Sequence, residues 1–403
     1  MREGASSVRH PAVAAAIVAS IASVLPIYLV GAMAVQLRAD LELSASGLGE
    51  AAFCYFLSAA AGSTVAGRVV DSIGARRGLL IAGTATAVGM TGFALTASTW
   101  RIALGFLSVA GLANAVAHPA ANLLLAQVVP EAHRGLGFGL KQAAIPAATF
   151  IGGLFVPLFA LTIGWRWAFG AGVLLALLGM LLVRRSSSRG RPGGERRKPL
   201  QSDVALRPLL VMSLAAGLGS AAALSVGTFY VDSTVASGVR PLWAGLLFAL
   251  GSAFGIAARI AVGVLADRRA SRHLLRVSAM FIAGAVGFLL ITLDWWPALV
   301  LATVLVFGAG SGWQGLFIHS LVRQSPGAPA FATGIAQIMV SIGSALGPPV
   351  FGRVVDARGY DAAWLLCAGL AVAAALTLLL GRRLALAERE RRSEVALLET
   401  IPT

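Results

Sequence analysis

Three polar side chains recur at every fourth residue within a long apolar stretch: Asn114, His118 and Asn122. Side chains with this spacing lie on one face of an α-helix, within roughly 80 degrees of arc. In a membrane helix such a face is costly unless it meets a partner or a wet cavity, so the pattern predicts a solute-binding face. His118 can also change charge near neutral pH, which suits a proton-coupled step. A neutral histidine that only donates a hydrogen bond is the alternative.

Other polar residues extend this candidate cavity set. Lys141 and Gln142 lie near the start of a later apolar run, where Lys141 could draw an anionic solute inward or extend towards lipid headgroups. Tyr28 is a further candidate, whereas Arg259 is expected to be a partner inside the bundle. No Asp or Glu lies near the middle of an apolar run. The pattern therefore disfavours a cation site and mildly favours a neutral or anionic solute.

The composition places these residues in membrane helices. Hydrophobic side chains make up 58% of the 403 residues and charged ones only 12%, whereas soluble proteins carry about a quarter charged residues. Crossing the hydrocarbon takes about 20 apolar residues per helix. The apolar runs of suitable length are 12–36, 47–66, 78–97, 102–129, 137–161, 165–183, 209–231, 242–265, 274–293, 297–321, 331–354 and 362–380.

The net charge of +15 is distributed as a topology signal. Basic residues concentrate in alternate segments between apolar runs rather than on one soluble face, so we expect no nucleic-acid partner. The positive-inside rule then places both termini in the cytoplasm of a multi-pass protein of the cell membrane. We expect a six-helix bundle at 1–183, a Ser/Gly/Pro/Arg-rich linker at 184–207, a second bundle at 208–383 and a cytoplasmic tail at 384–403.

The two halves are related by an internal repeat, displaced by about 195 residues. In this register His118 aligns with Gln314, which becomes a candidate for the opposite wall of the cavity. A run of matches at loops and kinks argues for duplication and for a site between the halves at mid-depth. Gly67, Asp71, Pro130, Gly139, Gln142, Gly152 and Gly164 fall on Gly263, Asp267, Pro326, Gly334, Gln337, Gly347 and Gly359.

The segment that follows the second apolar run resembles a signature of the major facilitator superfamily. The family pattern G-x-L-A-D-R-x-G-R-K is met at Gly67, Asp71, Gly74, Arg76 and Arg77. A second copy matches at Gly263, Asp267 and Arg268. The resemblance covers nearly the whole chain and implies an all-α integral membrane protein, with twelve transmembrane helices in two pseudo-symmetric six-helix bundles. It also implies that this charged cluster is a gate between the halves; a simple topology anchor is the alternative.

Two further matches to the family are looser. Arg101-x-x-x-Gly105 is similar to a second family motif, with Leu104 in place of its usual glutamine, and Arg101 could equally snorkel to the interface. The Gly347-Pro348 sequence resembles the motif that the family's antiporters carry in the fifth helix, although here it stands in the eleventh. The fifth predicted helix has Pro146 instead. An export function resting on this motif is therefore in doubt.

These patterns predict a secondary active transporter that moves a small organic solute by alternating access, with an anionic solute and proton coupling as options. A proton-driven efflux antiporter for drugs or metabolites is the main alternative, and a channel or membrane receptor a remote one. No phosphate-binding G-x-x-x-x-G-K-[ST] loop appears. Cys54 and Cys367 are isolated, and there is no metal-spaced His/Cys cluster. We expect neither an enzyme nor a cofactor or metal, and a monomer.

Overall fold

The computed structural model describes residues 11–130, 141–186, 205–268, 273–293, 295–325 and 328–399. Within these ranges the regular elements are helices, which satisfy their backbone hydrogen bonds internally, as a bilayer requires. The first half comprises α2 (Pro11–Ala32), α3 (Ala34–Leu41), α4 (Ala45–Ile73), α5 (Ala75–Thr96), α6 (Trp100–Val128), α8 (Ala144–Phe155), the π-helix η2 (Val156–Ala160) and α9 (Trp165–Arg185).

The second half repeats this plan with different breaks. Helix α15 joins two spans, because Gly359 interrupts its helical geometry. Most of the predicted linker, residues 187–204, lies outside the described ranges. The elements are α10 (Leu206–Ala236), α11 (Pro241–Arg268), α12 (His273–Ile291), α13 (Trp296–Leu305), the π-helix η3 (Val306–Gly310), α14 (Gln314–Gln324) and α15 (Pro329–Glu399).

The helices account for the predicted membrane spans. In the described part of the chain, nine helices are long and apolar enough to cross a bilayer. The bent helix α4, the shorter apolar helix over Ala144–Ala160 and the second span of α15 supply the others. Outward-facing side chains are apolar as well: Leu95, Leu174 and Leu376 are 77, 67 and 61% exposed. An exposed apolar surface of this kind fits lipid rather than water.

The internal repeat is visible in the backbone. Gly164 and Gly359, which the sequence register aligns, have φ angles of +102° and +83° and stand at equivalent helix junctions. Only glycine adopts such angles without strain, so both copies retain it at the point where the fifth and eleventh spans turn into the next. Of the other aligned residues, Gly139 and Pro326 lie outside the described residues.

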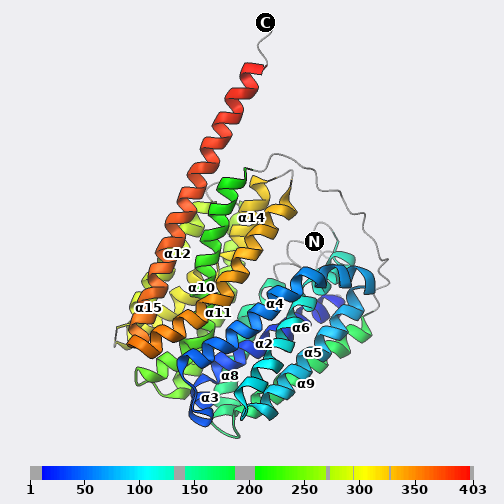
Figure 1. The fold of residues 1–403 in the computed structure, drawn as a ribbon, viewed down its shortest axis with the longest axis vertical. Helices are drawn as coiled ribbons and strands as arrows, with labels where there is room; N and C mark the ends of the chain where they lie inside the picture. The colour runs from blue at the N-terminus through cyan, green and yellow to red at the C-terminus, as the bar shows by residue number, and fades with distance from the viewer. Residues whose placement is uncertain are drawn as a thin grey trace.

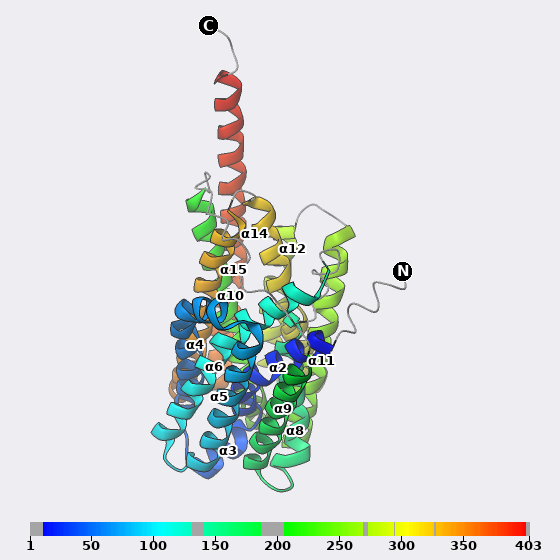
Figure 2. The same ribbon diagram turned by 90° about the vertical axis from the view of Figure 1, so that its right-hand side faces the viewer.

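Figure 1 shows the two halves as helical bundles that meet at one end and diverge towards the other. Figure 2 shows the same helices from the side, where the halves overlap. We call the end that holds Pro11, Arg185 and Leu206 the terminus end, and the opposite end the far end. The last part of α15 continues beyond the bundle at the terminus end as a single helix (Figure 1). The bundles meet at the far end, where α4 packs along α15 and α8 along α11. A site between the halves is therefore closed from the far end.

Candidate functional site

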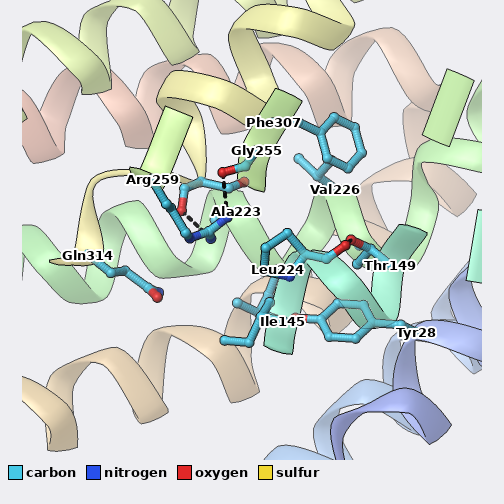
Figure 3. Close-up of a pocket in the computed structure, with 13 residues that line it drawn as sticks. Tyr28, Ile145, Thr149, Ala223, Leu224, Val226, Gly255, Arg259, Phe307 and Gln314 are labelled. Carbon is cyan, nitrogen blue, oxygen red and sulfur yellow. Dashed lines mark hydrogen bonds between the residues drawn. The ribbon is translucent and has the colours of Figure 1, made fainter. Parts of the chain in front are cut away.

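A pocket lies between the two halves and is built from both (Figure 3). Helices α2 and α8 form one wall, and α10, α11, η3 and α14 form the other. Its position is the one that the repeat predicts for a solute site. The lining residues are Tyr28, Ile145, Pro146, Thr149, Ala223, Leu224, Val226, Gly227, Gly255, Arg259, Phe307, Ser311 and Gln314.

Arg259 supplies the charge in this pocket. One of its terminal nitrogens, Nη2, donates a 2.7 Å hydrogen bond to the Ser311 carbonyl, and Nη1 donates a 3.3 Å bond to the Gly255 carbonyl. Neither partner is charged, and no described carboxylate forms an ion pair with the guanidinium. The two carbonyls therefore fix the orientation of Arg259 but leave its positive charge uncompensated, and a guanidinium in that state attracts carboxylate or phosphate groups.

The break in the tenth span explains why Ser311 is available to Arg259. The span changes from the α13 helix to the π-helix η3 and then to a short turn over 311–313, before α14 resumes at Gln314. A π-helix followed by a turn releases carbonyls from the regular helical ladder, and such breaks are frequent at functional sites. The Ser311 carbonyl can thus accept from a side chain instead of a backbone amide.

Neutral polar groups complete the pocket. Figure 3 shows Tyr28, Gln314 and Thr149 around the same space as Arg259. The Thr149 hydroxyl donates to the Pro146 carbonyl at 3.0 Å, so its oxygen lone pairs remain available to a ligand. Tyr28 is only 6% exposed. Such groups can hydrogen-bond a polar solute and fix its orientation while Arg259 holds its charge.

The predicted face of the fourth span is divided among different environments. The Asn114 amide oxygen accepts a 3.1 Å hydrogen bond from Ser23, whose carbonyl accepts from the Tyr55 hydroxyl at 2.6 Å. Asn114 is therefore satisfied within the first bundle. Asn122 is exposed, and none of the three residues of the face lines the pocket described above. Of the predicted cavity residues, Tyr28 and Gln314 do line it.

His118 and Lys141, both predicted from sequence, form a direct pair. The Lys141 Nζ and His118 Nδ1 atoms lie 2.6 Å apart, and Lys141 is 4% exposed. An ammonium group has no lone pair, so it must donate to an unprotonated Nδ1. A positively charged Lys141 therefore keeps His118 neutral. With Lys141 protonated, the pair carries one positive charge, which no described carboxylate compensates.

The other predicted cavity and motif residues lie on exposed surfaces or in helix packing. Gln142, Gln337 and Arg101 are exposed. Pro146 lines the pocket. In α15, Gly347 packs so tightly that a Cβ atom would lie 2.3 Å from the Ala221 carbonyl oxygen; Pro348 follows it on the side of α4.

Among the described residues, the charged cluster at the end of α4 has no hydrogen bond or ion pair with the second half. Asp71, Arg76 and Arg77 are exposed, and Arg76 donates to the Arg184 carbonyl of its own half at 2.8 Å. A Cβ atom on Gly67 would meet nothing within 4 Å, so close helix packing is not realised there. Gly74 links α4 and α5 with a φ of +83°. The side chains of Gly263, Asp267 and Arg268 lie outside the described part of the structure.

Polar contacts between the halves are found instead at the far end. Arg38, at the end of the first span, forms an ion pair with Asp232 of α10 at 2.6 Å and donates to the Tyr360 hydroxyl of α15 at 3.0 Å. Tyr360 also donates to Asp232. The Asp232 carboxylate is 8% exposed, so water screens this contact only weakly.

Asp356 adds a second link at the same end. Its two carboxylate oxygens accept hydrogen bonds from the Ala45 and Ser46 amides, each at 2.9 Å. These amides belong to the first turn of α4, where free N–H groups and the helix dipole favour a negative charge. A side chain of the second half therefore caps a helix of the first. We call Arg38, Asp232, Asp356 and Tyr360 the far-end latch.

Close backbone contacts support the far-end latch symmetrically. A Cβ atom on Gly49 of α4 would lie 2.6 Å from Pro349 of α15, and one on Gly245 of α11 would lie 3.0 Å from the Gly153 carbonyl oxygen of α8. Gly49 and Gly245 are equivalent in the internal repeat, as are Gly153 and Pro348, whose carbonyl oxygen would lie 2.7 Å from the Gly49 Cβ atom. Glycine at both positions lets the helices approach to backbone contact.

Sequence reasoning missed the groups that carry most of this geometry. Arg259 was expected to be a bundle partner, and its two carbonyl contacts agree with that in part, but it also lines the pocket. The far-end latch was not predicted, because its members lie at helix ends where charged residues are common. Their only sequence signal is that Arg38 and Asp232 carry opposite charges at equivalent ends of the first and seventh spans.

Comparisons with known proteins agree with this architecture. A family model described as Major Facilitator Superfamily matches residues 13–329. An uncharacterized MFS-type transporter of Mycobacterium tuberculosis (strain ATCC 25618 / H37Rv) is 26% identical over 329 residues, which cover 76% of this chain and 71% of the relative. The putative metabolite transport protein YwtG of Bacillus subtilis (strain 168) is 28% identical over 153 residues, covering 37% of this chain and 33% of its own.

Solved structures with the same fold share little sequence with the chain. The D-xylose-proton symporter has a TM-score of 0.70 at 16% identity, with 90% of this chain and 96% of the other covered. A bacterial homolog of the human lysosomal transporter Spinster, in an inward-facing and occupied conformation, has a TM-score of 0.71 at 15% identity, with 92% and 96% covered. The nucleoside transporter NupG has a TM-score of 0.72 at 14% identity, with 92% and 99% covered.

Proposed function

The chain belongs to the Major Facilitator Superfamily, and from this membership we propose that it is a secondary transporter of a small organic anion, whose negative charge is bound by Arg259. The observation that carries the proposal is the position of Arg259. It lines the pocket between the halves, its hydrogen-bond partners are neutral carbonyls, and no described carboxylate pairs with it. Charged residues inside membrane proteins usually mark a substrate pathway or an internal pair.

The rest of the pocket fits an anion better than a cation. Its other polar groups are hydroxyl, phenol and amide functions, and no acidic residue lines it. The aromatic residues that line it are Tyr28 and Phe307, one from each half. The pocket therefore offers one fixed charge and a few neutral donors and acceptors, which is the arrangement that a small carboxylate or phosphate ester requires.

The orientation in the membrane follows from charge. The terminus end carries the basic clusters at Arg76, Arg77 and Arg184, and the positive-inside rule assigns that end to the cytoplasm. The far-end latch then closes the external side, and the bundles diverge towards the cytoplasm (Figure 1). We infer that the conformation described here is inward-facing and that transport exchanges it with an outward-facing one.

We further propose that the Lys141–His118 pair exchanges the coupling proton. While Lys141 is protonated, its buried ammonium group has no described carboxylate partner. It donates a hydrogen bond to the lone pair of His118 Nδ1. Loss of one proton leaves a neutral pair that keeps a hydrogen bond. Ionisable residues inside membrane helices, histidine among them, often belong to proton relays.

Thermal stabilisation of the purified protein tests anion binding. A ligand that binds only the folded state raises the unfolding temperature. We expect one or more small carboxylates or phosphate esters to stabilise the wild type, while the matched neutral amides or alcohols do not. Replacing Arg259 with Gln should abolish the effect, and Arg259→Lys should retain part of it, because lysine keeps the charge but loses the guanidinium geometry. Equal stabilisation of the wild type and Arg259→Gln by the same compounds would refute the proposed role of Arg259.

A further inference from the structure

A second cavity lies at the far end, outside the transport pathway. It is formed in the elbow of α15, where Gly359 separates the eleventh span from the twelfth. We call it the elbow cavity. Its apolar lining includes Val350, Val354, Ala362 and Leu366, and its charged lining is Arg353 and Arg358.

The elbow cavity opens towards the lipid side of the bundle. Val350 is 44% exposed, and its neighbours Leu346 and Leu365, on the two arms of the elbow, are 50% and 51% exposed. Large apolar side chains with this exposure face acyl chains in a membrane protein. The apolar lining of the cavity is therefore continuous with a surface that lipid already covers.

The two arginines lie near the turn between the eleventh and twelfth spans, where we expect the membrane boundary, and no described carboxylate pairs with them. Arg353 and Arg358 are both exposed. The acid between them, Asp356, is committed to the amides of Ala45 and Ser46 in the far-end latch. Two cations above an apolar groove match a phospholipid, whose phosphate lies at the boundary and whose chains lie below it.

We propose that the elbow cavity binds an anionic phospholipid of the leaflet at the far end, with its headgroup phosphate held by Arg353 and Arg358 and an acyl chain lying along Val350, Val354 and Leu366. The site differs from the pocket of Arg259 in position and in ligand. It also bears on gating, because its arginines alternate along one helix with Asp356 and Tyr360 of the far-end latch. A bound headgroup would hold this stretch in its closed position.

Native mass spectrometry of the intact protein tests the site directly. With phosphatidylglycerol or phosphatidylcholine added at equal concentration, the wild type should retain more phosphatidylglycerol. An ionic contact at an exposed surface contributes up to about 1 kcal/mol, so Arg353→Gln and Arg358→Gln should each weaken that binding by up to roughly fivefold. Arg240→Gln, which removes an exposed far-end arginine outside the cavity, is the charge-matched control and should leave binding unchanged.

Several results would overturn the proposal. Equal retention of the two lipids by the wild type would do so, as would equal loss of phosphatidylglycerol in Arg240→Gln and Arg353→Gln. Competition by glycerol phosphate or inorganic phosphate at concentrations similar to those of the lipid would show a soluble phosphate site instead. An unchanged unfolding temperature in lipid-free detergent confirms that each variant is folded. Because lipid retention requires no transport, a failed transport assay does not affect this test.

Discussion

At the scale of single residues, two basic side chains between the helices have no acidic partner among the described residues. Arg259 and Lys141 both lie inside the helical bundle, and each is held by a neutral partner: backbone carbonyls for Arg259 and an imidazole for Lys141. A buried charge without a counter-ion is expensive, so it is retained where a ligand or a proton transfer provides the compensation. We assign the solute to Arg259 and the proton to Lys141 with His118.

The proton assignment predicts a separation of two activities. In vesicles, Lys141→Met should abolish the response of uptake to an imposed pH gradient, because the pair can no longer exchange a proton. Counterflow of the solute at equal pH should persist, because the solute site at Arg259 is intact. Fluorescent measurement of internal pH alongside labelled solute distinguishes the two activities. A Lys141→Met protein that still accumulates solute in response to the pH gradient would refute the assignment; Lys141→Arg is the control that keeps the charge.

Affinity for the solute should respond to Arg259 by a definite amount. A hydrogen bond to a charged group contributes about 1.5–3 kcal/mol, so Arg259→Gln should weaken binding roughly 10- to 100-fold. Titration of the purified variant with the anion that stabilises the wild type, followed by heat release or by unfolding temperature, measures this ratio. A change of less than about twofold would place the anion elsewhere.

The sequence predicted some residues of the candidate site, but not which contacts they form. His118 and Lys141 were each recognised as polar groups in apolar runs, but their contact joins two different spans and has no local pattern. Tyr28 and Gln314, the second suggested by the internal repeat, line the pocket between the halves, and their contact with a solute stays a prediction. Asn114 was expected to need a polar partner inside the membrane, and its amide oxygen accepts a hydrogen bond from Ser23. Polarity therefore identified which side chains need a partner, whereas the packing of the spans decided which partner each one has.

At the scale of elements, breaks and caps determine what each helix can do. The π-helix η3 and the turn after it release the Ser311 carbonyl that orients Arg259. The first turn of α4 offers amides that its own N-cap, Ser44, satisfies in part, and Asp356 from the other half satisfies two more. The contribution of Asp356 to this helix end exists only while the halves touch at the far end, and we therefore propose that α4 and α15 form a gate.

The far-end latch predicts how a single carboxylate biases the conformations. Asp356→Asn removes the charge from the α4 cap, which costs about 0.5–2 kcal/mol in the latched state and should raise the share of the opposite state roughly 2- to 30-fold. Spin labels at Arg185→Cys and Arg323→Cys, placed in opposite halves in a background lacking Cys54 and Cys367, report this opening. The shorter distance, with the terminus end closed, should gain population. An unchanged distance distribution would contradict the gating role of Asp356.

The existence of the helices was predictable, while their irregularities were not. Length and hydropathy predict the spans, and the aligned glycines Gly164 and Gly359 predict two equivalent turns, which the backbone confirms. The π-helices η2 and η3 were not predicted, although Pro157 in η2 and Gly308 and Gly310 in η3 are residue types that disturb a regular helix. The contact of Asp356 with the start of α4 has no local sequence pattern. Asp356 lies 311 residues after Ala45 and 310 residues after Ser46 in the chain.

At the scale of the whole molecule, the halves form one pocket and one closed end. Contacts at Arg38, Gly49 and Gly245 close the far end, while the cluster at Asp71, which sequence reasoning took for the gate, lies exposed at the other. Both observations fit one state of the alternating cycle that we propose. We propose that Asp71 and its neighbours form their contacts in the opposite state, which accounts for a gate motif without a partner here.

The orientation gives a simple labelling prediction. A membrane-impermeant maleimide should react in intact cells with Ser237→Cys, at the far end, in a background lacking the two native cysteines. It should react with Arg185→Cys only after the membrane is opened, because the positive-inside rule places that end in the cytoplasm. The reverse pattern would invert the topology and would make the described conformation outward-facing.

Solute counterflow tests the central claim, that two halves alternate around an anion held by Arg259, most directly. Vesicles containing the purified protein are loaded with the unlabelled anion that stabilises it, and the labelled anion is added outside. We predict saturable uptake that internal anion accelerates, and its loss in a folded Arg259→Gln protein. Flux that neither saturates nor responds to internal anion, or that continues unchanged in Arg259→Gln, would contradict the account.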